Sequence, residues 1–162
     1  MEIQRLKKRT RESLYLREGG SLISLYVVCV INVADIGYNG YNYEGSIRRR
    51  IAYCRPDSMT TRLTEGISFC LVAIFKQKII GMIEVRNGNH IGLLFVDDCY
   101  HNNGIAKNLV SLAIEKSKAT EIDVNSSLYA VNIYKRMGFE QFGDEQMRGG
   151  IRLIPMKKSI IT

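Results

Sequence analysis

In the middle of the chain, apolar residues form three short runs separated by polar turns. The runs extend from Phe69 to Phe75, from Ile79 to Val85 and from His90 to Val96, and their length and β-branched content are typical of buried strands. Lys76-Gln77-Lys78 separates the first two, and Asn87-Gly88-Asn89, a strong turn signal, separates the second and third. The pattern predicts a three-stranded antiparallel meander.

The spacing of the apolar residues changes directly after the third run. From Gly104 to Lys118 they recur every three or four residues, which predicts an amphipathic helix. A short strand is predicted from Glu121 to Val124. The connection is long enough for this strand to lie parallel to the strand that ends at Val96.

A second helix is predicted after Ser126 or Ser127, either of which can cap it, and Gly138 suits its end. Its apolar face follows helical spacing and comprises Ala130, Ile133, Tyr134 and Met137. The segments from Phe139 to Phe142 and from Ile151 to Met156 are then predicted to form a closing strand pair across Gly149-Gly150.

The first third of the chain has a less regular pattern. Glu2 to Leu6 is compatible with a short strand, and the β-branched residues between Leu22 and Ala34 favour a strand there. Asp35 to Gly45 reads as a loop with three tyrosines that could border an acceptor. Gly45 to Tyr53 is predicted as a short helix, and Ser58 to Leu63 as a turn or a further short helix.

Length and composition favour one ordinary globular domain over residues 1–162, because hydrophobic residues make up 46% and charged residues 24% of the chain. The net charge of +7 would suit an acidic partner. However, Lys7-Lys8-Arg9 and Arg48-Arg49-Arg50 are not interleaved with aromatic residues, so we expect solvated surfaces and no nucleic-acid partner.

Membrane and metal partners are not expected either. The longest apolar stretch, from Leu22 to Ala34, is shorter than the roughly 20 residues that a spanning helix needs. The four cysteines show no Cys-x-x-Cys pair, so neither a zinc site nor a disulfide framework is indicated. Together with the charged N-terminal region, which lacks a signal-peptide pattern, these features predict a cytoplasmic protein.

The loop between Val96 and the helix that starts near Gly104 has the properties of an anion site. Asn102, Asn103 and Gly104 tolerate unusual backbone angles, so several amides could turn inward together. Free amides and the positive end of a helix dipole favour a phosphate group. A purely structural turn is the alternative interpretation of this loop.

Two motifs in this region resemble the signatures of the GNAT family of N-acetyltransferases. His101, Gly104 and Ala106 fall at i, i+3 and i+5, as in the family's Arg/Gln-x-x-Gly-x-Gly/Ala pyrophosphate loop, with His101 replacing the usual Arg or Gln. The segment from Ser127 to Phe139 resembles Asn-x-x-Ala-x-x-x-Tyr followed by Gly-Phe, with Ser127 replacing the asparagine.

The resemblance implies an α/β (α+β) GNAT fold. Its central sheet is expected to be mixed, mostly antiparallel, of six to seven strands, split between the fourth and fifth and flanked by about four helices. It also implies that Leu22 to Ala34 is helical, in conflict with strand propensity there. Acetyl-CoA would lie in the split as the acetyl donor. The main chain of Leu94, Phe95 and Val96 would bind its pantetheine arm, with Ser127 opposite. Its pyrophosphate would bind at His101, Asn102, Asn103, Gly104, Ile105 and Ala106.

Three side chains are candidates for acid-base catalysis. Tyr134 corresponds to the family's tyrosine that protonates the leaving thiolate; an isolated tyrosine on such a helix face would otherwise be core. His90 lies where some relatives supply a glutamate base, and imidazole titrates near neutrality; a structural histidine in a turn is the alternative. Glu84 is the reserve base, with a solvent-facing strand residue as its alternative, and a water chain could replace both.

The resulting hypothesis is an acetyl-CoA-dependent N-acetyltransferase that acts on a primary amine of a small molecule or peptide by direct attack. The competing hypothesis is a non-catalytic module that binds acyl-CoA or a basic-patch partner. A monomer or homodimer is expected. The sequence does not identify the acceptor.

Overall fold

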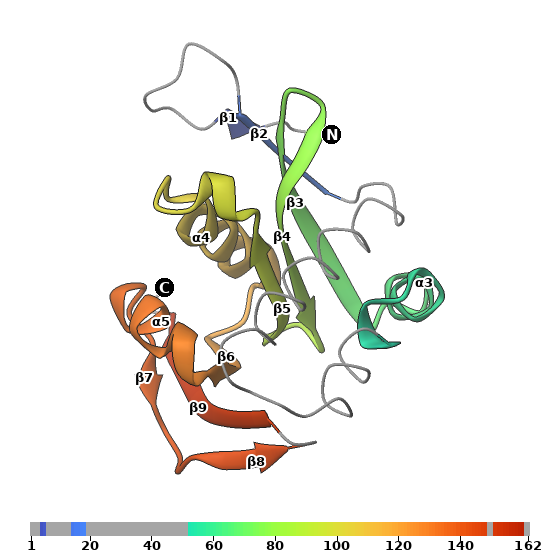
Figure 1. The fold of residues 1–162 in the computed structure, drawn as a ribbon. Coiled ribbons are helices and arrows are strands. Elements are labelled where there is room, and N and C mark those ends of the chain that lie inside the picture. The colour runs from blue at the N-terminus through green and yellow to red at the C-terminus, as the bar shows by residue number, and fades with distance from the viewer. Residues whose placement is uncertain (1–3, 6–13, 19–51, 149–150, 161–162) are drawn as a thin grey trace.

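The computed structural model describes residues 4–5, 14–18, 52–148 and 151–160 (Figure 1). Its strands form one sheet, in the order β1-β2-β3-β4-β5-β6-β9-β7, with β8 paired to β9. The strands are β1 (Gln4–Arg5), β2 (Leu14–Glu18), β3 (Ser68–Phe75), β4 (Lys78–Arg86), β5 (His90–Val96), β6 (Glu121–Ser127), β7 (Glu140–Gln141), β8 (Gln146–Arg148) and β9 (Ile151–Ser159).

Helices cover the sheet on both faces. The α-helices that lie wholly within the described residues are α3 (Pro56–Thr64), α4 (Ile105–Ser117) and α5 (Val131–Arg136), and residues 52–54 are helical as well. Two 3₁₀ turns, η1 (Asp98–Tyr100) and η2 (Leu128–Ala130), precede α4 and α5. Figure 1 shows α4 and α3 on opposite sides of the central strands. The sheet is therefore the middle layer of the molecule.

The sheet opens between β5 and β6, which form its one parallel pair in the described part of the chain. These strands are in register only at His90 with Asp123 and at Ile91 with Val124. Beyond Val124, β6 continues to pair along its other edge with β9, as far as Ser127. The split that the sequence led us to expect is thus confirmed.

The predicted fold class is also confirmed. All other strand pairs are antiparallel. The described part contains nine strands, and seven remain when the two-residue strands β1 and β7 are left aside.

Each face of the sheet packs its own hydrophobic core. One core joins the sheet to α4 and α5 and includes Ile83, Leu109 and Phe139. The other joins it to α3 and includes Met59, Val72 and Phe95. Because both faces are covered, β4 is buried over most of its length. Its sequence is therefore a nearly continuous apolar run and does not alternate between apolar and polar residues.

Several details differ from the expectations. Strands β2 and β8 were not anticipated. Of the two alternatives for Ser58 to Leu63, a turn or a short helix, the helix is confirmed, and it extends over the whole of α3. Ser127 does occupy the N-cap position of η2, which leads into α5, but its side chain makes no capping hydrogen bond. Ser126 lies within β6, and its hydroxyl donates to the Ser127 carbonyl. Helix α5 begins at Val131 without a side-chain cap, directly after η2.

The predictions for Leu22 to Ala34, for Asp35 to Gly45 and for most of Gly45 to Tyr53 lie outside the described residues. Within the described ranges, we find no helix with the length and apolar character needed to cross a membrane.

Candidate active site

The loop that leads from β5 into α4 has the geometry of an anion site. Asn102 has a φ of 61° and Gly104, the N-cap of α4, has a φ of 76°. No side chain caps the helix, so the amides of its first turn lack intrahelical partners. The Asn103 side-chain amide donates to the carbonyls of Tyr100 and His101 at 3.1 and 3.0 Å, which holds the loop in shape.

Gly104 is required for reasons of backbone conformation rather than packing. A Cβ at this position would meet only Asn108 Nδ2, at 3.9 Å, and would otherwise face open space. The positive φ nevertheless disfavours any other residue. The absence of a side chain leaves the approach to the α4 amides uncovered.

His101 ties this loop back to the end of β5. Its Nε2 lies 2.9 Å from the Val96 carbonyl and 3.2 Å from an oxygen of Asp98. Because a carbonyl can only accept, Nε2 carries the proton in this contact. His101 therefore fixes the loop to the strand, and one acceptor position on the Val96 carbonyl is already occupied.

The backbone of Leu94, Phe95 and Val96 lies at the open edge of the sheet. These residues pair with β4 on one side, whereas the pairing with β6 ends at Ile91 in the described structure. Ser127 ends β6 on the far side of the same opening. Unpaired strand edges of this kind can accept an extended chain as an added strand.

A bulge interrupts β5 just before this open edge. Glu84 pairs with Leu93 and Val85 pairs with Ile91, so Gly92 is an extra residue on β5. Bulges of this type bend a strand and leave one residue outside the regular ladder, often beside active sites.

His90 and Asp123 form a side-chain pair where β5 and β6 meet. His90 Nδ1 contacts a carboxylate oxygen of Asp123, and the two residues are also in register across the strands. Both side chains are only partly exposed. If Nδ1 donates to the carboxylate, the other ring nitrogen is left to accept a proton.

Glu84 occupies a different environment from the one expected for a strand surface. The residue is fully buried, which contradicts the solvent-facing alternative. Both of its oxygens accept from Arg62 of α3, at 2.7 and 3.1 Å. Burial lowers the pKa of Arg62, but the Glu84 contact outweighs it and the pKa is raised overall. The carboxylate is therefore held as half of a bidentate ion pair.

Tyr134 lies on α5 and is buried, with an exposed fraction of 5%. Its ring packs edge to face on Phe139, with centroids 5.2 Å apart. Gly138, with a φ of 85°, turns the chain between them. The Gly-Phe part of the motif thus fixes the position of the Tyr134 ring.

Sequence reasoning missed three residues on the α3 face of the sheet, namely Tyr53, Arg62 and Arg86. The Arg62 guanidinium lies 3.7 Å from the centroid of the Tyr53 ring, and that of Arg86 lies 5.3 Å away. Burial, and next the charge of Glu84, raise the pKa of Tyr53 to about 12. No sequence pattern marks these residues, because they come from separate elements.

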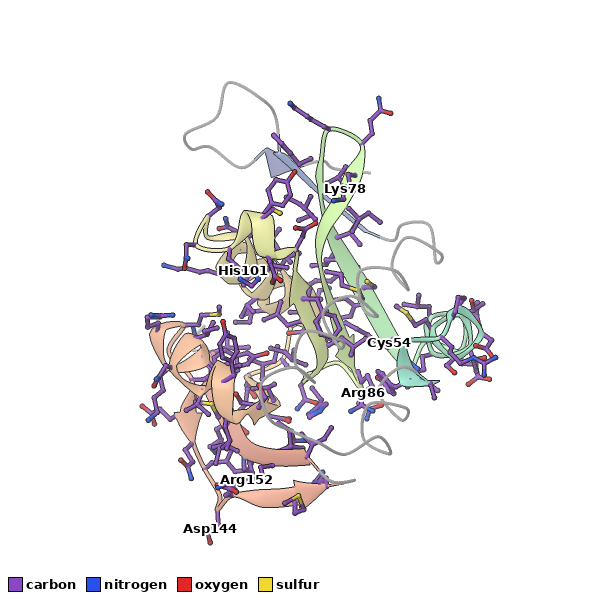
Figure 2. All side chains as sticks on the ribbon, viewed as in Figure 1. Cys54, Lys78, Arg86, His101, Asp144 and Arg152 are labelled. Atoms are coloured by element: carbon purple, nitrogen blue, oxygen red, sulfur yellow. The ribbon has the colours of Figure 1, made fainter. Side chains whose placement is uncertain are left out.

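The anion-site loop and the proposed base therefore lie at opposite ends of β5. The loop from His101 to Ala106 lies at its end and His90 at its start, six residues before Val96, a span of about 20 Å in a strand. Figure 2 shows His101 beside the start of α4 and Arg86 at the far end of β4. The open edge of β5 connects the two groups.

Residues 38–160 match the acetyltransferase (GNAT) domain family. N-alpha-acetyltransferase 30 of Saccharomyces cerevisiae is 40% identical over 62 residues, which cover 34% of this chain and 35% of the relative, so the chain matches about a third of that protein's length.

Two solved structures cover nearly the whole chain. A GCN5-related N-acetyltransferase from Rhodopseudomonas palustris has a TM-score of 0.76 at 17% identity, covering 90% of this chain and 94% of its own. The PaiA N-acetyltransferase of Thermoplasma acidophilum, solved with coenzyme A, has a TM-score of 0.73 at 20% identity, covering 91% and 99%. At these identities the likeness establishes the fold.

Proposed function

Because this chain belongs to the GNAT family of acetyltransferases, we propose that it transfers the acetyl group of acetyl-CoA to a primary amine by direct attack. The observation that carries this proposal is the split between β5 and β6, with an uncapped helix start at one end and the His90–Asp123 pair at the other. The fold alone would require neither a free anion site at one end of the opening nor an oriented histidine at the other.

The residues around the split fit a long, polar, anionic donor. The free amides at the start of α4 suit a pyrophosphate, since they combine several donors with the helix dipole. The unpaired edge of Leu94 to Val96 suits an extended amide-containing arm. His101, Asn102, Asn103, Ile105, Ala106 and Ser127 complete the proposed binding set. Bound there, the donor supplies an acetyl group activated as a thioester.

We assign the proton transfers to residues on both sides of the split. His90, oriented by Asp123, would take the proton of the attacking amine at the ring nitrogen that does not face the carboxylate. Tyr134 would donate its phenolic proton to the departing thiolate. Direct attack needs no nucleophile from the protein, so an acid, a base and positioning are sufficient.

Glu84 is less suited to the role of base. Its two oxygens are engaged by Arg62, and releasing one would leave a buried charge without its partner. We therefore propose that Glu84 anchors α3 through Arg62, and that His90 is the base.

Titration calorimetry of acetyl-CoA binding tests this proposal. The second readout is the release of coenzyme A thiol in the presence of each amine of a panel. Gly104→Val should weaken binding at least tenfold, because the new side chain covers the proposed phosphate position. Gly66→Val is the matched control. Gly66 also has a positive φ, of 70°, and no atom within 4 Å of its Cβ position, so it carries the same backbone strain without the ligand.

The two variants separate the possible outcomes. If both bind acetyl-CoA as tightly as the wild type, the proposed phosphate site is wrong. If the wild type binds acetyl-CoA but releases no thiol with any amine, the chain is a binding module rather than an enzyme.

A further inference from the structure

Two polar groups converge on the bulge in β5. A Cβ at Gly92 would lie 3.0 Å from Arg86 Nε and 3.1 Å from the Tyr53 hydroxyl. Both atoms are buried, and within the described residues neither makes a hydrogen bond of ordinary length and angle, although the Glu84 carboxylate lies close enough to the Tyr53 hydroxyl to raise its pKa. A buried donor without a partner costs free energy, so two of them at one position indicate an acceptor that the described residues do not supply.

Among the described residues of this face, one cation has no counter-ion. Arg62 of α3 forms an ion pair with Glu84 of β4. Asp123 of β6 contacts His90. Arg86 makes no ion pair with any described residue, and its guanidinium only approaches the Tyr53 ring. Within the described part of this face, the unbalanced charge is therefore positive and belongs to Arg86.

Arg86 is also placed directly opposite the proposed base. Arg86 of β4 and His90 of β5 are partners in the antiparallel register, and side chains of such partners lie on one face with Cβ atoms about 5 Å apart. A ligand that reaches Arg86 can thus also lie close to His90.

We propose that the acceptor is a carboxylate-bearing amine of the α-amino-acid type. The carboxylate binds to the Arg86 guanidinium and the Tyr53 hydroxyl, and the amine, one carbon away, faces His90. This inference rests on the proposed function and names its substrate class. A neutral carbonyl, as in a peptide N-terminus, would satisfy the donors but would leave the Arg86 charge unbalanced.

The test compares each free amino acid with its amide, which differs only in the charge of the proposed anchor group. L-Alanine is measured against L-alaninamide, and L-phenylalanine against L-phenylalaninamide, by thiol release at saturating acetyl-CoA. Wild-type protein should prefer the acids. In Arg86→Gln the ratio of kcat/KM for acid over amide should fall by about tenfold to a hundredfold, the usual effect of losing a hydrogen bond to a charged group.

Matched variants identify the cause of any change. Arg136→Gln removes an exposed arginine of α5 and should leave the acid-to-amide ratio at its wild-type value. Tyr53→Phe deletes only the hydroxyl and Arg86→Lys keeps the charge without Nε–H, so both should lower the ratio less than Arg86→Gln. These two also serve if Arg86→Gln fails to fold. Because every variant is compared with the wild type, the different basicities of the acid and amide amines cancel.

Failure of this inference is distinguishable from failure of the proposed function. Thiol release with amides but not acids, or an equal loss of both in Arg86→Gln, would overturn the carboxylate assignment and leave the acetyltransferase intact. Without acetyl-CoA binding, the function itself fails. The anion site is then tested by titrating N-acetylalanine and N-acetylalaninamide into wild type and Arg86→Gln. If N-acetylalanine binds wild type more tightly than it binds Arg86→Gln, the result supports the anion site. If it binds both proteins equally, the result excludes the site.

Discussion

At the scale of single residues, the chemistry of the candidate site depends on contacts between side chains that are far apart in the sequence. His90 of β5 contacts Asp123 of β6 across the parallel strand pair. Arg62 of α3 donates to Glu84 of β4. Each contact fixes the orientation of a group that would otherwise rotate. For His90, this orientation decides which ring nitrogen faces the acceptor.

The His90–Asp123 pair is testable by a double-mutant cycle on kcat. His90→Ala should lower kcat about 10²-fold, the lower end for a general base, and Asp123→Ala by about tenfold through loss of orientation. Because the two residues act as one unit, the double variant should be no slower than His90→Ala alone. Asp123→Asn, which can still accept from Nδ1, should recover part of the loss.

Asp144→Asn is the control for this cycle, since Asp144 is exposed on the bend between β7 and β8 (Figure 2). If the effects of His90→Ala and Asp123→Ala instead multiply, Asp123 does not act through His90. If His90→Ala retains wild-type kcat, the base is a water chain or another group.

The sequence identified some of these residues and missed others for physical reasons. His101, Gly104 and the loop between them were found because one strand-to-helix turn holds them together, and Tyr134 because Gly138 and Phe139 follow it closely. Their roles stay predictions. Tyr53, Arg62 and Arg86 were missed because only the packing of α3 against the sheet brings them together, and local pattern carries no information on that packing.

At the scale of elements, the approach of α4 to β4 depends on one glycine. A Cβ at Gly81 would lie 3.1 Å from the Phe95 carbonyl oxygen and 3.2 and 3.3 Å from side-chain carbons of Ile105 and Leu109. A backbone carbonyl within a sheet cannot move aside easily. The glycine thus lets the helix that carries the loop amides lie directly on the sheet.

Gly81→Ala should therefore destabilise the fold by about 1–3 kcal/mol, the usual cost of overpacking a core. The free energy of unfolding in urea measures this. Gly143→Ala is the matched control, because its Cβ would meet only Pro155 carbons at 3.5 and 3.7 Å, an ordinary contact. Equal stability of the two variants would show that α4 can shift outward without cost.

The elements that were predicted correctly are those with strong internal patterns. Strands β3, β4 and β5 and helix α4 follow from apolar runs and helical spacing. Strands β2 and β8 are short and partly polar, and they form because a neighbouring strand offers an open edge: β2 pairs with β3, and β8 with β9. That stabilisation comes from the partner strand, so the segment's own pattern does not reveal it.

At the scale of the whole molecule, the sheet separates two cores with different connections to the site. The core on the α4 side includes Tyr134, whereas the core on the α3 side includes Cys70, which is the partner of Glu84 in the register of β3 and β4. Helix α3 is held to the sheet partly by the Arg62–Glu84 pair, which is buried and therefore costly to break. Closure of the second core is thus coupled to the proposed acceptor face.

Cysteine reactivity reports on this second core. Cys54 and Cys70 are buried within it, whereas Cys99 is exposed in η1. Burial, and next the charge of Glu84, raise the pKa of Cys70 to about 12. At pH 8 only about one part in 10⁴ of such a thiol is thiolate, the reactive form, and at pH 10 it is still mainly protonated.

Iodoacetamide at pH 8 should consequently label Cys99 rapidly and leave Cys54 and Cys70 unmodified, as read by peptide mass mapping. Raising the pH to 10 should leave Cys70 slow, since its thiol titrates only above that range. Labelling of Cys54 and Cys70 should begin together with global unfolding in urea, because both require α3 to leave the sheet. Rapid labelling of Cys70 in native buffer would show that α3 opens independently of the rest of the fold.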